Sequence, residues 1–395
     1  MRFAIRSPLF FASCLCLLTV LLPSLLFAEV RTWTNQNGEK VEAEYISHDD
    51  NQVTIRRTAD GQEFQFPIRL LTPADQQWLQ GRGEGIYIAV GNGAHRMSSL
   101  DGVTWTNHVY LDEPGHDQND LKDIAVGNGA CIAIGGYSKS NIFVTNDGVT
   151  WEKNPFNIGV LSGVIFHDDR FIAFGEGGRI AASKDGETWE KIGDADLRAH
   201  LDQEAKALGE EKRIKSNIRS WTESGGTFVG SGDGGFLIVT KDFEDWQFPP
   251  RIDPRSRLYI ASDDNGFVVK GKQTLHHSPD GLTWTDVTPE IGDQKIVSIV
   301  HDGEKFLANT NDKQGWTSKD GMEWELVDDA TFPGHLAALR PDLYYSFQNY
   351  WKFTEDLLRS TDGGETWESC VLPAPAGITH MIFAEGFPTF PAPEE

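Results

Sequence analysis

Cysteine is scarce in this chain, and the few cysteines that it has are poorly placed for cross-links or metal binding. Four cysteines occur among 395 residues. Cys14 and Cys16 lie in an apolar N-terminal segment, which leaves Cys131 and Cys370 far apart in the sequence. Two isolated cysteines exclude a disulfide framework and the paired spacing of a zinc site. We therefore expect both to be small buried residues, and we expect no metal and no cofactor.

Positive charge is also scarce. The 35 lysines and arginines are outnumbered by 59 aspartates and glutamates, which gives a net charge of −24 at pH 7. A protein of this charge is repelled by phosphate backbones and by anionic membrane surfaces. Nucleic acid is therefore excluded as a partner, and we interpret the acidic excess as a means of solubility.

Long apolar runs are absent beyond residue 28. Before that point, Arg2 and Arg6 precede an apolar stretch over residues 9–27, which is interrupted by Pro23 and followed by Ala28. This order is typical of a secretory signal peptide; a membrane anchor is the alternative, and Pro23 and the short run argue against it. We therefore expect a signal peptide over residues 1–28, export to the periplasm or the extracellular space, and no membrane insertion after its removal.

The sequence does contain a motif that occurs seven times. Each copy has a serine or threonine, any residue, an aspartate, usually a glycine, and a tryptophan four or five residues after the aspartate. The hydroxyl residues are Ser99, Thr145, Ser183, Thr240, Ser278, Ser318 and Ser360, and the aspartates are Asp101, Asp147, Asp185, Asp242, Asp280, Asp320 and Asp362. The tryptophans are Trp105, Trp151, Trp189, Trp246, Trp284, Trp324 and Trp367. More than half of the 12 tryptophans thus occupy one structural position.

The residue types of this motif are those of a tight hairpin. Aspartate, serine and threonine side chains can form hydrogen bonds with the backbone of their own turn. Glycine adopts the positive φ that such turns require, and tryptophan packs a large apolar face beneath the turn. Each motif therefore predicts a hairpin tip between two antiparallel strands. In the fourth copy Phe243 replaces the glycine, so we expect a looser tip there.

Two more strand-like runs precede each motif, for example residues 121–126 and 131–134. Each unit thus has four short strands, which is typical of a β-propeller blade. The first unit starts at residue 85 without an innermost strand, while residues 378–383 resemble an innermost strand with nothing after it. We expect the C-terminal strand to complete the first blade and close the ring. The expected fold is all-β, with a seven-bladed β-propeller over residues 84–386 and a disordered tail over residues 387–395.

The motifs resemble the Asp box, also called the bacterial neuraminidase repeat. Residues 360–367 fit the family pattern S-x-D-x-G-x-T-W in full, and the other six copies are one residue shorter between the aspartate and the tryptophan. The resemblance covers about three-quarters of the chain and implies a sialidase-like propeller fold. It implies little about function, because Asp boxes occur in sialidases, other glycosidases, sorting receptors and photosystem assembly factors.

Residues 29–82 do not follow the repeat. Alternation over residues 41–46, two short strand-like runs and the Asp60-Gly61 turn predict a small β-barrel, and Thr72 and Pro73 predict the start of a short helix. Arg31, Trp33, Ala43, Gly61 and the Leu-Thr-Pro-Ala-Asp run over residues 71–75 closely resemble the SLA homology domain, which is SH3-like. In a eukaryotic adaptor that domain binds short peptide motifs, so the resemblance implies protein contacts here.

Candidate site residues are expected on the face opposite the hairpin tips, where the connections between blades lie. Three arginines between the fourth and fifth units are candidates for binding: Arg251, Arg255 and Arg257. A polar and aromatic group in the last unit suits protein or sugar contacts: Tyr345, Gln348, Tyr350 and Trp351. The acidic loop 112–120 is a weaker candidate, either for Ca²⁺ or as a solvated surface.

One insertion breaks the repeat between Asp185 and Asp242. Leu197, Leu201, Ala205 and Leu208 recur there at helical spacing among charged residues. This pattern predicts an amphipathic helix within residues 194–217, beside the fourth blade. The helix is interpreted as a lid, as a docking element for a partner, or as a cover over an apolar patch.

Three functions are compatible with the sequence. The first is an exported, non-catalytic binding or scaffold protein with a protein- or glycan-binding face. The second is a sialidase-like glycoside hydrolase, which needs three arginines around a carboxylate, a tyrosine–glutamate pair and a free aspartate. Arg219, Arg257 and Arg340 lie on or near expected innermost strands, but their neighbours do not match that family. The third is an assembly factor for an envelope complex. We favour the first and predict no catalytic residue.

Overall fold

The computed structural model describes residues 30–48, 51–80, 85–111, 118–209, 216–347, 353–385 and 387. The expected signal peptide and nearly all of the expected C-terminal tail lie outside these residues. Among them the fold is all-β, with two α-helices, α1 (Pro73–Gln80) and α2 (Leu197–Leu208). The strands form eight four-stranded antiparallel sheets over the described ranges. In this part of the chain no helix has the length and apolar character needed to cross a membrane.

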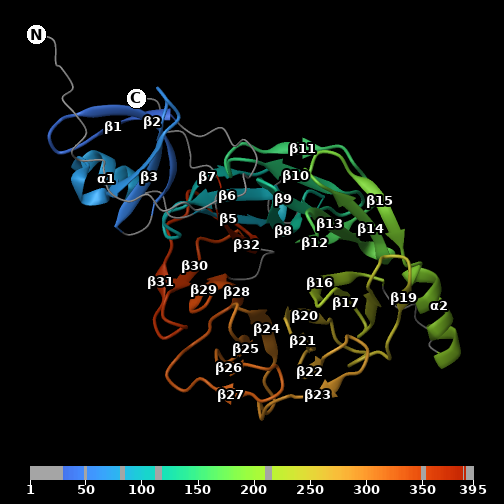
Figure 1. The fold of residues 1–395 in the computed structure, drawn as a ribbon. Coiled ribbons are helices and arrows are strands. Elements are labelled where there is room, and N and C mark those ends of the chain that lie inside the picture. The colour runs from blue at the N-terminus through green and yellow to red at the C-terminus, as the bar shows by residue number, and fades with distance from the viewer. Residues whose placement is uncertain are drawn as a thin grey trace, which may run out of the picture.

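Seven of these sheets, all within residues 85–385, succeed one another around a propeller-like ring (Figure 1). Ring sheet 1 contains β32 (Ile378–Glu385), β5 (Gly85–Gly91), β6 (His95–Ser99) and β7 (Thr106–Val109). Ring sheet 2 contains β8 (Leu121–Gly127), β9 (Ala130–Gly135), β10 (Asn141–Thr145) and β11 (Glu152–Asn154). Ring sheet 3 contains β12 (Leu161–His167), β13 (Arg170–Gly175), β14 (Arg179–Ser183) and β15 (Glu190–Asp194). Ring sheet 4 contains β16 (Ile218–Ser224), β17 (Thr227–Gly232), β18 (Leu237–Thr240) and β19 (Trp246–Gln247).

The remaining ring sheets have the same strand order. Ring sheet 5 contains β20 (Tyr259–Asp263), β21 (Gly266–Lys270), β22 (Leu275–Ser278) and β23 (Thr285–Asp286). Ring sheet 6 contains β24 (Ile296–His301), β25 (Phe306–Thr310), β26 (Gly315–Ser318) and β27 (Glu325–Leu326). Ring sheet 7 contains β28 (His335–Arg340), β29 (Leu343–Phe347), β30 (Leu357–Ser360) and β31 (Glu368–Ser369). The first strand of each sheet contacts the first strand of the next, so these strands are innermost.

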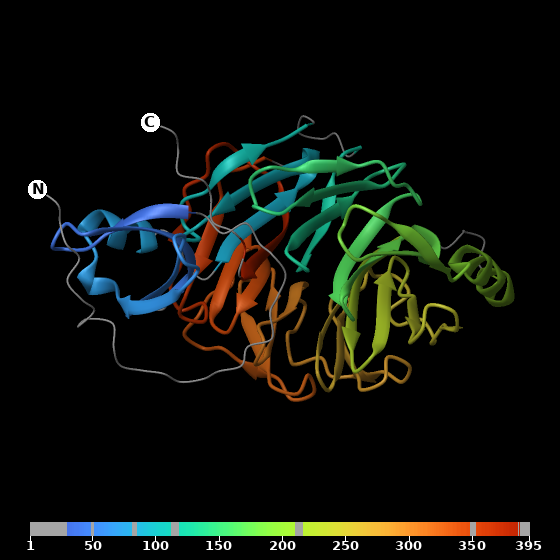
Figure 2. The same ribbon diagram turned by 45° about the horizontal axis from the view of Figure 1, so that its top comes forward.

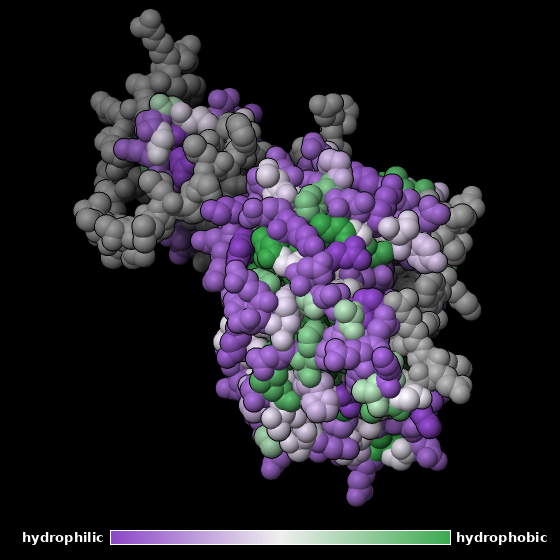
Figure 3. All heavy atoms as spheres, turned by 90° about the vertical axis from the view of Figure 1, so that its right-hand side faces the viewer, coloured by the Kyte–Doolittle hydropathy of each residue, from purple (hydrophilic) through white to green (hydrophobic). Residues whose placement is uncertain are grey.

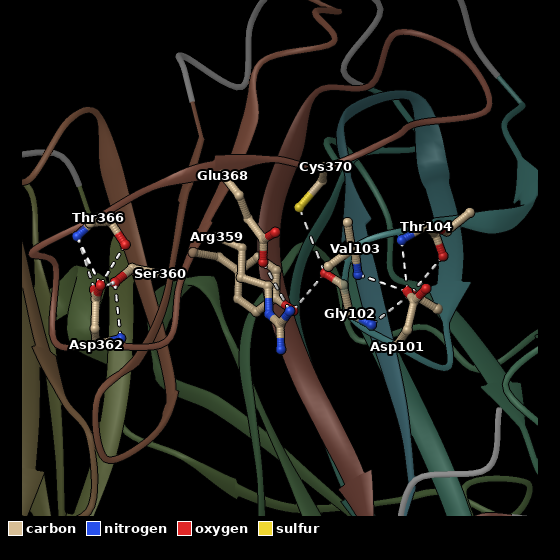
Figure 4. A network of polar contacts seen from close by, with 12 residues as sticks. Asp101, Gly102, Val103, Thr104, Arg359, Ser360, Asp362, Thr366, Glu368 and Cys370 are labelled. Atoms are coloured by element: carbon tan, nitrogen blue, oxygen red, sulfur yellow. Dashed lines mark hydrogen bonds and ion pairs between the residues drawn. The ribbon is translucent and has the colours of Figure 1, made fainter. Parts of the chain in front are cut away.

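The C-terminal strand closes the ring, as predicted. β32 pairs with β5 in antiparallel register, with Ile378 opposite Gly91 at one end of the pair. Ring sheets 7 and 1 are joined near their outer edges by backbone hydrogen bonds, one of them from Trp105 N to Val371 O at 2.9 Å. Gly102 O accepts hydrogen bonds from the Tyr345 hydroxyl at 2.8 Å and from Cys370 Sγ at 3.6 Å (Figure 4). Ring sheets 7 and 1 are therefore joined from the centre to the rim.

The seven repeated motifs form the turns between third and fourth strands, and we call them the aspartate turns. In the six shorter ones, aspartate Oδ1 accepts hydrogen bonds from the second and third backbone amides that follow, at 2.7 to 3.0 Å. In the longer last turn, Asp362 Oδ1 accepts from Thr366 N at 3.0 Å (Figure 4). The serine or threonine hydroxyl lies 2.8 to 3.4 Å from the same carboxylate in every turn. The predicted side-chain hydrogen bonds are thus confirmed.

The repeated tryptophans pack beneath these turns. Trp105 and Trp189 are buried, and the other five are half-buried. Four of them donate from Nε1 to a glycine carbonyl of their own turn, with distances between 2.7 and 3.2 Å; these are Trp189, Trp284, Trp324 and Trp367. These four tryptophans therefore stabilise the turns that they cover.

The turn without glycine keeps its structure, contrary to the looser tip that we expected. Phe243 takes the glycine position with a φ of 63°. Its backbone amide donates to Thr240 Oγ1 at 2.9 Å, and Asp242 still accepts both of its backbone hydrogen bonds. The phenyl ring is buried and lies 4.6 Å from the Phe228 ring centroid. This burial offsets the cost of a left-handed backbone for a residue with a Cβ.

The predicted helix exists and covers an apolar patch. The side chains of Leu197, Leu201 and Ala205 on α2 are buried in a cluster that includes Trp221 and Phe236 of ring sheet 4. Figure 1 places α2 at the outer rim of the ring, and Figure 3 shows this side of the molecule as mainly hydrophilic with separate apolar patches. Of the three interpretations of the helix, the structure supports the cover.

The N-terminal sheet lies outside the ring (Figure 2) and has the order β1 (Val30–Thr34), β2 (Lys40–His48), β3 (Gln52–Arg57) and β4 (Glu63–Pro67). The 3₁₀-helix η1 (Ile68–Leu70) and α1 follow it. Trp33 Nε1 donates to Ala43 O at 3.2 Å, and Asp75 accepts from Arg31 Nη2 at 2.5 Å. The Thr72 hydroxyl accepts from Asp75 N at 3.3 Å, as predicted for a helix cap. Several residues that carry the resemblance to the SLA homology domain therefore form hydrogen bonds with one another in this region.

We predict that Phe243→Gly destabilises the protein, although glycine is the consensus residue at this position. Truncation of a buried phenylalanine costs about 3–5 kcal/mol, whereas relief of the left-handed backbone returns about 1–2 kcal/mol. The free energy of unfolding should therefore fall by roughly 2 kcal/mol, measured by chemical denaturation. A variant that is as stable as the parent, or more stable, would show that the phenyl ring contributes little.

Candidate functional site

The ring has two chemically different faces. The aspartate turns and the hairpins between first and second strands lie on one of them. The other face carries the second-to-third strand connections and the links from one ring sheet to the next. We call this second face the connection face.

The aromatic candidate at the end of ring sheet 7 is part of the core at the one position that the structure describes. Tyr345 is fully buried, and its hydroxyl donates a hydrogen bond to Gly102 O at 2.8 Å. The preceding Tyr344 is equally buried and donates to Asp302 Oδ2 at 2.6 Å. β29 is an inner strand of its sheet and is covered on both sides, so neither ring is offered to a ligand. Gln348, Tyr350 and Trp351 lie outside the described residues.

The three candidate arginines have different surroundings. The Arg251 side chain is only 8% exposed, and its Nε lies 3.0 Å from Glu204 Oε1 of α2, so it fastens the helix to the ring. Arg255 and Arg257 are exposed on the link between ring sheets 4 and 5. Within the described part of the chain, the Arg255 side chain has neither an ion pair nor a hydrogen bond. Arg257 Nε lies 3.5 Å from Asp233 Oδ1.

Asp233 brings a fourth arginine into this group. Arg219, near the start of β16, forms a bidentate pair with Asp233, with Nε–Oδ1 at 2.7 Å and Nη2–Oδ2 at 2.6 Å. Asn217 Nδ2 also donates to Oδ2 at 3.2 Å. Burial raises the pKa of Asp233, but Arg219, Asn217 and Arg257 outweigh burial and hold it below its ordinary value. Asp233 is therefore ionised at neutral pH and balances only one of the positive charges around it.

A buried lysine lies in the neighbouring ring sheet 5. Lys270 ends β21 opposite Tyr259, the first residue of β20. Its Nζ donates to Ile296 O at 3.1 Å and lies 4.9 Å from the Tyr259 ring centroid. Burial lowers the pKa of Lys270 to about 8, so the amine is still mostly protonated at pH 7.

We call Arg219, Arg255 and Arg257, together with Asp233, the arginine cluster.

The structure does not bring together the three arginines considered for a sialidase-like clamp. Arg219 and Arg257 meet at Asp233 on the connection face. Arg340 is the last residue of β28, and its guanidinium carbon lies 5.9 Å from the Phe383 ring centroid. The innermost strands all run in the same direction. Arg219 lies near the start of its strand and Arg340 at the end of its own, so Arg340 lies on the opposite face of the ring.

The remaining candidates have structural roles where they are described. In the acidic loop 112–120, residues 112–117 lie outside the described part, and Asp120 Oδ1 accepts a hydrogen bond from Gly93 N at 3.0 Å. No group of three or more potential ligands from His, Cys, Asp and Glu surrounds a metal-sized site in the described residues. Cys131 and Cys370 are buried free thiols, as expected. Burial raises the pKa of Cys370 to about 12.

The arginine cluster was only partly recognisable in the sequence. Arg255 and Arg257 stand out because they are close together after two prolines. Arg219 and Asp233 are separated from them in the chain, and only the pairing of β16 with β17 brings those two together. No local pattern marks Asp233 as the shared partner.

Comparisons with known proteins find only remote likenesses, all of them among solved structures. No family model matches the chain, and no curated protein matches it. Among solved structures, YCF48 from Cyanidioschyzon merolae is 14% identical with a TM-score of 0.49, over 81% of this chain and 93% of that one. Virginiamycin B lyase from Staphylococcus aureus is 11% identical with a TM-score of 0.49, over 66% and 86%. The WD40 β-propeller domain of Doa1 is 14% identical with a TM-score of 0.44, over 66% and 85%.

We predict that Arg219 and Asp233 stabilise the fold together. Arg219→Met should lower the free energy of unfolding by about 1–3 kcal/mol, because a buried carboxylate loses its bidentate donor. Asp233→Asn in the same chain should restore part of this loss, because the unpaired charge is removed. A double-mutant cycle from denaturant unfolding measures the coupling, which should be about 1 kcal/mol or more. Additive effects of the two changes would contradict the pairing.

Proposed function

We propose that the ring is a seven-bladed Asp-box β-propeller over residues 84–386, and that residues 29–82 form an SH3-like SLA homology domain. Closure by β32 and the seven aspartate turns support the first assignment. The core formed by Arg31, Trp33, Ala43 and Asp75 supports the second. We further propose that residues 1–28 are a signal peptide and that the mature protein acts outside the cytoplasm. The residues after 386 form a tail in this proposal.

We propose that the protein is a non-catalytic scaffold whose connection face binds an acidic segment of a partner protein. The observation that carries this proposal is the arginine cluster. Arg257 lies beside a carboxylate already shared with Arg219, and the exposed Arg255 is two residues earlier on the same link. In a chain with a net charge of −24, such a local excess of positive charge attracts carboxylates that the rest of the surface repels.

The strength of this binding should depend on salt. Exposed ion pairs contribute about 0.2–1 kcal/mol each, so two arginines alone give a weak and reversible contact. Arg255 and Arg257 are on one link, so a partner can contact both with a short acidic stretch. Screening over about 8–10 Å at physiological ionic strength weakens these contacts. The glycosidase alternative has less support because Arg340 is remote, and no described residue favours the assembly-factor alternative.

The test uses a glutamate-rich peptide labelled with a fluorophore and the purified protein at low ionic strength. The double variant Arg255→Ala/Arg257→Ala should weaken binding severalfold, and added salt should weaken it further in the parent. Lys241→Ala is the matched control, because Lys241 is exposed within an aspartate turn on the other face. The control should bind like the parent, and all variants should melt alike.

Two results would overturn the proposal. One is binding that is equally strong in the parent and in the double arginine variant. The other is turnover of sialosides or other glycosides above background, with loss of turnover in Arg219→Ala or Arg257→Ala. Binding of an acidic glycan without binding of the peptide would show that the ligand of the arginine cluster is a sugar and not a protein.

A further inference from the structure

The seam between ring sheets 1 and 2 contains a buried arginine that has no counter-ion among the described residues. Arg96, the second residue of β6, is only 3% exposed. Its guanidinium carbon lies 4.1 Å from the Phe143 ring centroid on β10 and 5.8 Å from the Trp151 ring centroid. Nε and Nη1 of this guanidinium group are buried and have no hydrogen-bond partner in the described part of the chain.

A second unpartnered polar side chain lies at the same end of the seam. Asn92 is completely buried, and neither of its side-chain amide atoms has a hydrogen-bond partner within the ranges that the structure describes. It follows β5 directly, within the 3₁₀-turn η2 (Asn92–Ala94), while Val90 stands opposite Arg96 in the pairing of β5 with β6. The hairpin is so short that Asn92 and Arg96 flank one end of this strand pair.

No carboxylate among the described residues neutralises Arg96. Asp120 reaches this end of the seam, where its Oδ1 accepts a hydrogen bond from Gly93 N at 3.0 Å. A second cation is close by, because Lys153 Nζ lies 5.4 Å from the same Phe143 ring centroid. Burial lowers the pKa of Arg96 to about 10, with no opposing influence of a carboxylate, so the side chain stays charged at neutral pH.

A charge in this position needs compensation that the described chain does not supply. A buried water molecule satisfies N–H groups but leaves the positive charge unbalanced, and an unpaired charge is costly in a low-dielectric interior. A small anion supplies both the negative charge and the acceptor. Chloride is spherical, accepts from several N–H donors at once and occupies little more volume than a water molecule.

We propose that this seam binds one monovalent inorganic anion of the size of chloride, held by Arg96 Nε and Nη1 and by the Asn92 amide nitrogen. The anion joins ring sheet 1 to ring sheet 2 next to the closure of the ring. It is distinct from the arginine cluster of ring sheets 4 and 5, and it stabilises the fold rather than recruiting a partner.

Thermal unfolding tests the proposal when sodium gluconate is replaced stepwise by sodium chloride at constant ionic strength. A ligand at about ten times its dissociation constant raises the folded-to-unfolded ratio about elevenfold, so chloride should raise the midpoint of the parent. Arg96→Met fills a similar volume without a charge, so it should remove the chloride dependence. Arg255→Met, which changes an exposed arginine, should retain the dependence of the parent.

A parent midpoint that is the same in chloride and gluconate would overturn the proposal. So would an unchanged chloride effect in Arg96→Met. If that variant does not fold, crystals of the parent grown with bromide give an independent answer. An anomalous peak within hydrogen-bond distance of Arg96 and Asn92 supports the site, and a water molecule without anomalous signal there rejects it.

Discussion

In each ring sheet, one carboxylate holds the turn between the third and fourth strands by accepting hydrogen bonds from the backbone. The outer two strands are short, with only two residues in β19, β23, β27 and β31, so pairing alone gives them few hydrogen bonds. The aspartate turn fixes the direction in which the chain returns, and the tryptophan that follows covers the turn. The regularity of the ring depends on this unit, because each sheet must present the same shape to its neighbours.

This constraint also separates structure from function in space. The aspartate turns occupy one face and admit little variation, whereas the links on the connection face differ in length and composition from sheet to sheet. The insertion with α2 lies in one of these links, whereas Asn92 and Asp233 lie in second-to-third strand connections on the same face. Not every residue in a link is available for binding. Arg251 lies in a link, but its ion pair with Glu204 fastens α2 to the ring.

The repeat made most of the fold predictable. Residue types and spacing specified the turns, the four-strand units, the helix and the C-terminal closure, because all of them depend on local chemistry or on a simple count of strands. Burial at particular positions was not predictable in this way. Tyr345 belongs to a residue type that suits a binding surface, yet it fills the seam between the last and first sheets. Phe243 breaks the local rule for its turn, and a distant contact with Phe228 compensates.

If the seven aspartate carboxylates hold the ring together, NMR titration of their side chains detects it directly. Burial raises the pKa of Asp101 and Asp147, but backbone hydrogen bonds outweigh it, and these bonds are the largest influence at Asp185, Asp242, Asp280 and Asp320. The Thr366 side chain and backbone lower the pKa of Asp362 to about 2. A lowered carboxyl pKa stabilises the fold above pH 4, roughly, and this stabilisation is lost as the pH falls through the folded-state values. All seven carboxyl groups should titrate below the ordinary value for aspartate, and the protein should lose stability in the same acidic range. Ordinary pKa values at these aspartates, with stability unchanged down to pH 3 or so, would contradict this role of the carboxylates.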